Sequence, residues 1–208
     1  AAPEPAPAPP PPAAAPPTGP LPAAAKNARF AGNWLVITVD TLRGDRIRAE
    51  TAPNLAALAA RGTHFTQVYA QAPNTPRSFP SFLTSRLPSE VHFVKQSLNF
   101  SPLTGKDPTL FSALSAAGVR PYGVFSDFYL DAKTNLGSGL VEWQNPTAKN
   151  LRDSNSDIAA PRITQAVIDK LKQLAAASKG ASGSRFVLWT HLFDPHSIHW
   201  HGFRNVIP

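Results

Sequence analysis

The 208-residue sequence predicts an α/β fold of three layers, in which helices cover both faces of a mostly parallel sheet. Two observations support this prediction. Short apolar runs rich in β-branched residues alternate with longer runs whose apolar residues recur at helical spacing. Gly, Pro and Asp separate these runs, and no internal repeat is visible. Such an order joins parallel strands through helices, and a chain of this length can enclose one substantial core.

Four strands are expected, at 34–40, 64–70, 121–126 and 185–191. The first lies in "NWLVITVD", a continuous apolar run that ends in a carboxylate and is typical of a parallel strand buried on both faces. The second lies in "THFTQVYA", which alternates enough to favour a short strand. We expect "NLGSGLVEWQ" to form loop and turn, because Gly and Asn dominate its beginning.

Three helices are expected, at 53–61, 108–117 and 160–177. Thr51 precedes the first helix as an N-cap, and Gly62 follows it at the position where glycine commonly ends a helix. Pro53 lies in its first turn, and Leu55 and Leu58 are three residues apart, as on one face of a helix.

The second helix is expected to have Asp107 as its N-cap, Pro108 at its first position and Gly118 just beyond its end. The third is expected to end before Gly180. Apolar residues at helical spacing should face the sheet from these two helices: Leu110, Phe111 and Leu114 in the second, and Ile163, Val167, Ile168, Leu171 and Leu174 in the third.

Residues 1–32 differ in composition from the rest of the chain, because Pro and Ala make up most of them. A segment of this kind has little to bury, and we expect a disordered, extended tether before a folded domain at 33–208. A ligand for a Pro-recognising module is the alternative interpretation. A tether at this end suits a protein held at a bacterial envelope, so we expect an extracytoplasmic location, either periplasmic or membrane-tethered.

The composition excludes several kinds of site. The chain has no Cys, which excludes disulfides, thiolate zinc sites and cysteine nucleophiles. Its net charge of +7 favours anionic partners. The basic residues are scattered and no nucleic-acid-binding motif is present, so we expect small anionic esters as partners and no nucleic acid.

Polar residues follow three of the expected strands: Asp40 after the first, Thr75 after the second and His196 after the last. The carboxyl ends of parallel strands meet at one edge of a sheet, so these side chains should converge. A buried carboxylate needs a partner or a cation, and a divalent metal would also activate a threonine hydroxyl. Ordinary turn, cap and loop roles remain open for all three residues from spacing alone.

Four segments in collinear order support a more specific interpretation: "LVITVDTLRGD", "TAPNLAALAARGTHFTQVYAQAPNTPRSFPSFLTS", "PTLFSALSAAGVRPYGVFS" and "FVLWTHLFDPH". Together they resemble the N-terminal portion of a sulfatase-like enzyme of the alkaline phosphatase superfamily. The resemblance extends from about residue 33 to residue 196. It implies that superfamily's three-layer fold, incomplete at the C-terminus.

The resemblance implies roles for four residues. Asp40 matches the aspartate that binds the catalytic divalent metal. Thr75 matches the nucleophile, which also contacts the metal, because it lies nine residues before the Thr of the segment that replaces the family's Leu-Thr-Gly. His196 matches the histidine that contacts the ester's anionic group, and Arg77 could supply a further cation for the substrate.

The departures from the family pattern bear on the chemistry. Threonine cannot be converted to formylglycine, and Arg77 and Phe79 stand where the modification motif has Pro and Arg, so formylglycine is not expected. The stretch "SDFYLDAK" replaces the Gly-Lys-Trp-His segment of arylsulfatases. Threonine nucleophiles occur in related phosphoethanolamine and glycerol-phosphate transferases. Thr41 replaces the second aspartate of the common pair, as in the phosphonate monoesterase branch.

The metal ligands are expected to be incomplete. The family takes further ligands from a later strand, whereas this sequence ends at Pro208. We therefore expect weak metal binding and no turnover from the isolated chain, with the metal being Ca²⁺, Mn²⁺, Zn²⁺ or Mg²⁺. The residues Asp194, His196, His199 and His201 could substitute for the missing ligands, although loop histidines of this kind are commonly solvated.

The sequence thus favours a metal-dependent hydrolase or transferase that acts on sulfate, phosphate or phosphonate esters through Thr75. The alternative is a catalytically inactive sulfatase-like module that binds an anionic ligand or a protein partner.

Overall fold

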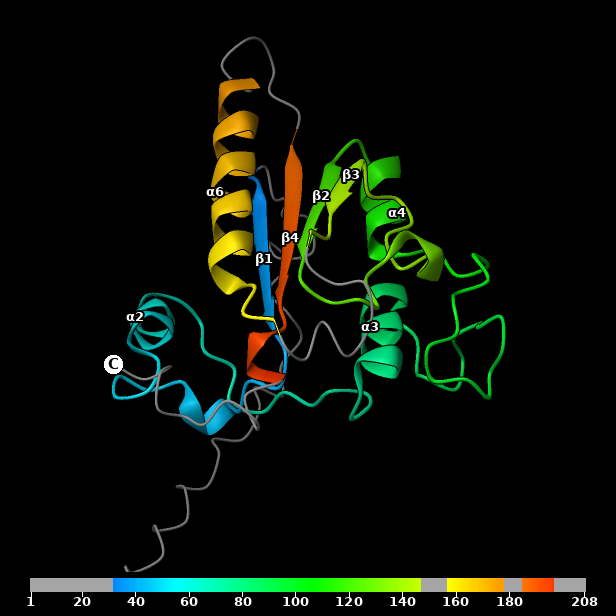
Figure 1. The fold of residues 1–208 in the computed structure, drawn as a ribbon, viewed down its shortest axis with the longest axis horizontal. Helices are drawn as coiled ribbons and strands as arrows, with labels where there is room; N and C mark the ends of the chain where they lie inside the picture. Colours follow the sequence, from blue (N-terminus) through cyan, green and yellow to red (C-terminus); the bar gives the residue numbers. More distant parts are fainter. Residues whose placement is uncertain (1–31, 147–156, 178–184, 197–208) are drawn as a thin grey trace, which may run out of the picture. The chain divides into compact units, whose positions relative to one another are not determined.

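The computed structural model describes residues 32–146, 157–177 and 185–196 (Figure 1). The expected tether therefore lies, except for its last residue, outside the described residues. Within the described ranges, no helix is both long enough and apolar enough to cross a membrane.

A four-stranded parallel sheet forms the centre of the fold. Its strands are β1 (Trp34–Val39), β2 (Arg120–Phe125), β3 (Glu142–Gln144) and β4 (Phe186–Leu192), arranged in the order β1-β4-β2-β3. Every pairing is parallel. The predicted α/β class and mostly parallel sheet are confirmed, and three of the four expected strands form within one or two residues of their expected bounds.

The fourth expected strand, at 64–70, does not form, and this prediction was wrong. Its residues have no regular structure, and Phe65, Val68 and Tyr69 are 73%, 75% and 79% exposed. The alternation that suggested a strand has no neighbouring strand to pair with among the described residues. Strand β3 forms instead within a stretch that we expected to be loop, where three residues pair with β2. Three residues are too few to give a periodic pattern.

Strand β1 lies at the edge of the sheet rather than in a fully buried position. Of the described residues, only those of β4 pair with it. Its side chains Trp34, Leu35 and Ile37 are 42%, 46% and 53% exposed. The continuous apolar run therefore predicted a parallel strand correctly, but its expected burial on both faces was wrong.

Helices lie on both sides of the sheet, as Figure 1 shows. Helix α6 (Ala160–Ala177) packs against β2 and β4 on one face. Helices α3 (Thr75–Thr84) and α4 (Leu110–Ala116) lie on the other. Successive residues of a strand point to opposite faces, so Leu188 packs in the cluster that includes helix α6, while its neighbour Trp189 packs in the opposite cluster.

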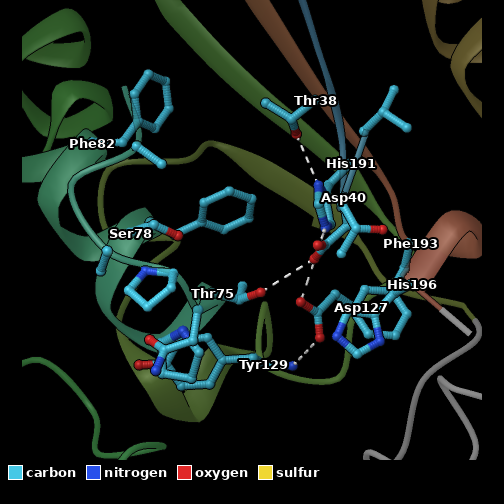
Figure 2. Close-up of a pocket in the computed structure, with 18 of the residues that line it drawn as sticks. Thr38, Asp40, Thr75, Ser78, Phe82, Asp127, Tyr129, His191, Phe193 and His196 are labelled. Carbon is cyan, nitrogen blue, oxygen red and sulfur yellow. Dashed lines mark hydrogen bonds and ion pairs between the residues drawn. The ribbon is translucent and has the colours of Figure 1, made fainter. Parts of the chain in front are cut away.

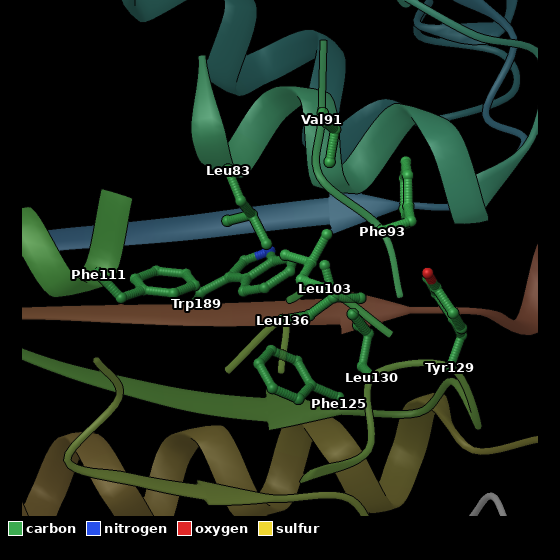
Figure 3. Packing of buried hydrophobic residues seen from close by; sticks show 10 residues of the cluster. All are labelled: Leu83, Val91, Phe93, Leu103, Phe111, Phe125, Tyr129, Leu130, Leu136 and Trp189. Carbon is green, nitrogen blue, oxygen red and sulfur yellow. The ribbon is translucent and has the colours of Figure 1, made fainter. Parts of the chain in front are cut away.

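Trp189 is the largest fully buried side chain among the described residues and lies at the centre of the core in Figure 3. Its ring stacks on Phe111, with centroids 5.3 Å apart, and meets the edges of Phe125 at 4.7 Å and Phe79 at 5.5 Å. Its indole Nε1 donates a hydrogen bond of 2.9 Å to Thr38 Oγ1. The aromatic core is therefore tied to a polar network at the end of β1.

The expected helices form, with corrections at their caps. Helix α2 (Pro53–Arg61) has Ala52 rather than Thr51 as its N-cap, because the Thr51 hydroxyl donates to the Arg46 carbonyl instead. Gly62 ends this helix in an extended rather than a left-handed conformation.

Helix α4 begins two residues later than expected, because Thr109 accepts the capping bond from the Ser112 amide. Gly118, with φ of +75°, follows the helix as predicted. Helix α6 has the expected bounds, but Ile168 is 40% exposed and does not join its buried stripe. Gly180 lies outside the described residues.

The described residues also contain three short 3₁₀ helices, η1 (Gly44–Arg46), η2 (Ala132–Thr134) and η3 (Asp194–His196).

Asp107, expected as a helix cap, instead joins two loops. Its buried carboxylate accepts hydrogen bonds from the backbone N–H and the ring of His92, at 2.8 and 2.9 Å, and forms an ion pair with Arg86 Nε at 2.9 Å. Burial alone would raise the pKa of Asp107, but the bonds from His92 and the charge of Arg86 outweigh it and hold this pKa below its ordinary value of 3.8.

Asp107→Asn is expected to lower the free energy of unfolding by about 2 kcal/mol at pH 7, because charged hydrogen bonds to buried groups are lost. A depressed folded pKa stabilises the fold above the unfolded value of 3.8, and this contribution disappears as pH falls through the folded pKa. Urea unfolding curves should therefore converge for wild type and variant at acid pH. Glu50→Gln, at a side chain that is 77% exposed, is the control. A constant difference across this pH range would contradict the assignment.

Candidate functional site

A cavity of about 970 Å³ opens at the carboxyl ends of β1, β2 and β4, where ligand sites of parallel sheets usually lie. Figure 2 shows its polar residues and the elements that carry them. Asp40 directly follows β1, Asp127 lies two residues beyond β2, and His191 is near the end of β4. Thr75 begins helix α3, and His196 belongs to η3.

Backbone and hydroxyl bonds hold these strand ends together. The Asp40 amide donates to the Leu192 carbonyl at 2.9 Å, which extends the β1–β4 ladder. The Ser126 hydroxyl donates to the His191 carbonyl at 3.0 Å and accepts from the Phe193 amide at 2.9 Å. Asp127, the next residue after Ser126, is thereby fixed beside His191.

Thr75 and Asp40 are in direct contact. Thr75 Oγ1 donates a hydrogen bond of 3.2 Å to Asp40 Oδ2. The hydroxyl also lies at the N-terminus of a ten-residue helix, where the aligned peptide dipoles favour negative charge. Prolines in α3 did not prevent the helix: Pro76 lies in the first turn, and Pro80 is buried. The sequence-predicted pair of Asp40 and Thr75 is therefore brought together.

Asp40 is held in its charged form. Burial alone would raise the pKa of Asp40, but the adjacent His191, the more distant His196 and the Thr75 hydroxyl together lower it below the ordinary value. At neutral pH the Thr75 hydroxyl therefore faces a carboxylate. Asp40 is also only partly buried, so its charge faces the cavity.

Asp127 was not predicted as a site residue. It is 1% exposed, and burial raises the pKa of its carboxyl. Its Oδ1 accepts from the Tyr129 amide at 2.9 Å, while Oδ2 is buried and has no hydrogen-bond partner among the described residues. The rule that drew attention to Asp40, a carboxylate just after a buried strand, applies equally to Asp127 and could have found it.

His191 was also missed, because its apolar flanks in "VLWTHLF" gave it the pattern of a core residue. It is 1% exposed, and its Nδ1 lies 2.9 Å from Thr38 Oγ1. Nε2 lies 3.5 Å from Asp40 Oδ2 and 4.0 Å from Asp127 Oδ2, and it too has no hydrogen-bond partner in the described structure.

Asp40, Asp127 and His191 can each offer one ligand atom, and these three atoms lie within 4.8 Å of one another. Two of these atoms, on Asp127 and His191, are buried without a hydrogen bond, which is the situation that a bound cation relieves. The residues present therefore fit a divalent metal of the kind expected from the sequence.

The other predicted site residues divide into two groups. His196 lines the cavity and stacks on Phe193, with ring centroids 4.4 Å apart. Arg77 is not brought to the cavity: its guanidinium donates to the Gln96 carbonyl at 2.7 Å and lies over the Phe93 ring.

Asp194 accepts from the first amide of helix α6, that of Ala160, at 2.9 Å. The expected alternative ligands His199 and His201 lie outside the described residues.

Comparisons with known proteins agree with the fold. One solved structure, of a candidate sulfatase from Bacteroides thetaiotaomicron VPI-5482, superimposes with a TM-score of 0.53 at 17% identity and covers 80% of this chain and 36% of that one. Another, of phosphonoacetate hydrolase from Sinorhizobium meliloti 1021 in complex with phosphonoacetate, gives a TM-score of 0.50 at 16% identity and covers 85% of this chain and 49% of that one.

The chain thus spans roughly a third to a half of the length of these two structures. No significant match was found among curated proteins. The family model described as Sulfatase matches residues 32–204, which is most of the chain and includes every residue of the cavity described above. The chain belongs to the sulfatase family.

Proposed function

We propose that the protein containing this chain is a metal-dependent hydrolase or transferase of phosphate, phosphonate or sulfate esters, with Thr75 as its nucleophile. The observation that carries the proposal is the contact of 3.2 Å between Thr75 Oγ1 and the ionised Asp40, at a helix N-terminus beside a large cavity. A hydroxyl that becomes an alkoxide needs a positive environment, which the helix N-terminus and a metal ion bound at Asp40 would supply.

In this mechanism the Thr75 hydroxyl loses its proton to solvent while its oxygen attacks the phosphorus or sulfur of the ester. The bond from that atom to the leaving oxygen breaks, and the leaving oxygen keeps the electron pair. A water molecule in a hydrolase, or an acceptor hydroxyl in a transferase, then displaces Thr75 from the covalent intermediate. His196 faces the same cavity and would contact the anionic oxygens of the substrate.

A divalent metal bound at Asp40 would lower the pKa of the threonine hydroxyl and offset the negative charge of the substrate. Among this chain's residues, Asp40 and Thr75 are the ligands expected from the sequence. Arg77 remains only a sequence-based expectation as a substrate contact, because its guanidinium is engaged with backbone carbonyls.

The cavity wall favours esters with an apolar leaving group. Aromatic side chains line much of it, including Phe79, Phe82, Phe128 and Tyr129. Phosphorus esters fit the nucleophile better than sulfate esters, because a threonine alkoxide lacks the means by which a formylglycine hydrate releases bound sulfate. The solved phosphonoacetate hydrolase has a similar fold, which is consistent with this preference.

The second candidate is a sulfatase-like module without activity, which binds an anionic ligand or a protein partner. Asp127 supports it, because an additional buried carboxylate beside Asp40 repels an anionic ester unless a cation is present. The expected tether and extracytoplasmic location remain predictions from the sequence under either candidate.

The test is a substrate comparison with the full-length protein in the presence of Mn²⁺ or Zn²⁺. An aryl phosphate or an aryl phosphonate monoester is expected to be cleaved with a kcat/KM at least about tenfold above that of the matched aryl sulfate, and chelation of the metal should abolish turnover. Release of the same nitrophenol from all substrates allows direct comparison. Preference for the aryl sulfate would overturn the nucleophile assignment, and absence of all turnover would favour the binding module.

A further inference from the structure

We propose that Asp127 and His191 bind a metal ion together with Asp40, and that this ligand set selects a Zn²⁺-like ion over Ca²⁺ or Mg²⁺. The inference rests on the proposed function only for the reaction that the ion would serve. Neither residue is implied by the resemblance of the sequence to the sulfatase family, from which the expected metal ligands in this chain are Asp40 and Thr75. The evidence is the hydrogen bonding around His191 and the unpartnered atoms that face it.

The hydrogen bonds of Thr38 determine which nitrogen of His191 carries a proton. Thr38 Oγ1 donates its single hydrogen to the Thr190 carbonyl at 3.1 Å and accepts from Trp189 Nε1 at 2.9 Å. With that hydrogen on the Thr190 carbonyl, Nδ1 is the donor in the remaining contact, 2.9 Å from His191 Nδ1 to Thr38 Oγ1. In the neutral ring, Nε2 then has no hydrogen and presents a lone pair.

Nε2 faces two carboxylate oxygens, where either a proton, which would lower the pKa of Asp40, or a metal ion can bind. Nε2 lies 3.5 Å from Asp40 Oδ2 and 4.0 Å from Asp127 Oδ2. Three electron-rich atoms that face one another repel unless positive charge lies between them. A proton on Nε2 would be poorly placed to supply it, because charged N–H···O bonds are usually about 2.7–2.9 Å long.

A metal ion accounts for these separations better than a proton does. For ligands about 2.0–2.2 Å from a tetrahedral Zn²⁺, two ligand atoms are about 3.3–3.6 Å apart, and wider angles increase this separation to about 4 Å. The 3.5 Å distance falls within the tetrahedral range, and the 4.0 Å distance would have to shorten by a few tenths of an ångström around a bound ion. The ion would also satisfy Asp127 Oδ2 and His191 Nε2, which are otherwise buried without a partner in the described part of the chain.

The nitrogen and oxygen atoms of this ligand set determine which metal ion the site prefers. An imidazole nitrogen suits Zn²⁺ and related transition metals, whereas Ca²⁺ takes six to eight oxygen ligands and Mg²⁺ prefers oxygen and water. The bond from Nδ1 to Thr38 also fixes the ring orientation, as the hydrogen-bond partners of histidine ligands commonly do. The site can accept further ligands, because Asp40 and its neighbours line the open cavity in Figure 2.

The experiment measures Zn²⁺ binding to the metal-stripped full-length protein by competition with a chromogenic chelator. Wild type is expected to bind Zn²⁺ at least about 100-fold more tightly than Ca²⁺ or Mg²⁺. His191→Gln and Asp127→Asn should each weaken Zn²⁺ binding by about 10-fold or more. The matched controls are His64→Gln, at an exposed histidine, and Asp131→Asn, at a carboxylate outside the cavity lining. Both controls should bind Zn²⁺ as wild type does.

Two further measurements separate loss of a metal ligand from loss of the folded structure. Circular dichroism shows whether each variant is folded, and the visible spectrum of bound Co²⁺ reports on the ligands directly, so it should change in His191→Gln. Wild-type Zn²⁺ affinity in both folded site variants, or equal affinity of wild type for Ca²⁺ and Zn²⁺, would overturn the inference. If His191→Gln does not fold, the Asp127→Asn affinity and the wild-type metal preference decide the question.

The same samples separate this inference from the proposed function. Zn²⁺ binding that depends on His191 and Asp127, without ester cleavage by wild type, would contradict the proposed function alone. Ester cleavage by wild type, with Zn²⁺ binding unchanged in both site variants, would contradict the metal-site inference alone.

Discussion

Thr75→Ala is expected to reduce the kcat of the full-length protein toward an aryl phosphate or phosphonate ester by about 10³-fold or more. Removal of a nucleophile eliminates the covalent route, and only substrate binding and electrostatic stabilisation then remain. The loss should appear in kcat rather than KM, because the Thr75 oxygen forms its new bond as the reaction proceeds. Steady-state kinetics of wild type and variant, measured with the same metal, provide the comparison.

Stability should change little in this variant, which separates a chemical effect from a folding effect. The Thr75 side chain is partly buried and makes a single hydrogen bond of 3.2 Å to Asp40, so its loss should cost about 1 kcal/mol. Thr75→Ser retains the hydroxyl and should keep measurable turnover.

The matched control is Ser78→Ala, which removes a hydroxyl from the same helix and the same cavity wall and should stay within about threefold of wild type. Equal activity of wild type and Thr75→Ala would remove Thr75 from the mechanism and leave the binding module as the better interpretation.

Trp189→Ala is expected to lower the free energy of unfolding by about 3–5 kcal/mol, the largest stability change among the variants considered. The indole is 1% exposed and packs against aromatic rings from α3, α4 and β2. The substitution leaves a cavity that the neighbouring rings on these three elements cannot fill. It also removes a hydrogen bond to Thr38, which holds His191.

Urea unfolding tests this prediction, and two further variants show how much of the stability loss comes from the ring and how much is specific to the core. Trp189→Phe keeps an aromatic ring but loses the Nε1 donor, so its cost should fall below that of alanine. Phe65→Ala, at a side chain that is 73% exposed, should change the free energy of unfolding by less than about 0.5 kcal/mol. A loss below about 1 kcal/mol for Trp189→Ala would mean that the core in Figure 3 is not the main source of stability.

The sequence by itself was enough to predict the helices and strands whose hydrophobic patterns extend over the whole element. Helix α6 has the expected bounds, because many apolar residues at helical spacing identify a helix and its buried side together. Strands β1, β2 and β4 were found because continuous β-branched and aromatic runs are typical of parallel strands.

Predictions from local sequence patterns were wrong where the structure depends on contacts with residues far away in the sequence. Residues 64–70 alternate like a strand but have no pairing partner among the described residues, and a strand is not stable without one. Asp107 was expected to cap a helix, but its carboxylate instead forms ion pairs with Arg86 and His92, which lie in other loops.

The candidate site divides in the same way. Asp40 and Thr75 were identified by their order along the chain and by resemblance to a family, and parallel strands then bring such residues to one edge of the sheet. Asp127 and His191 were not identified, and the expectation that this chain supplies only two metal ligands did not take them into account.

Only the tertiary structure decided their position. The three residues Asp40, Asp127 and His191 come from segments far apart in the sequence, and the pairing of β4 with both β1 and β2 places their side chains together. Hydrophobic patterns in the sequence indicate which residues are buried. The direction in which a buried polar atom points depends on contacts with residues from distant parts of the chain. For that reason the sequence could indicate where the chemistry collects, while only the packed strands show that a histidine nitrogen and two carboxylates face one another.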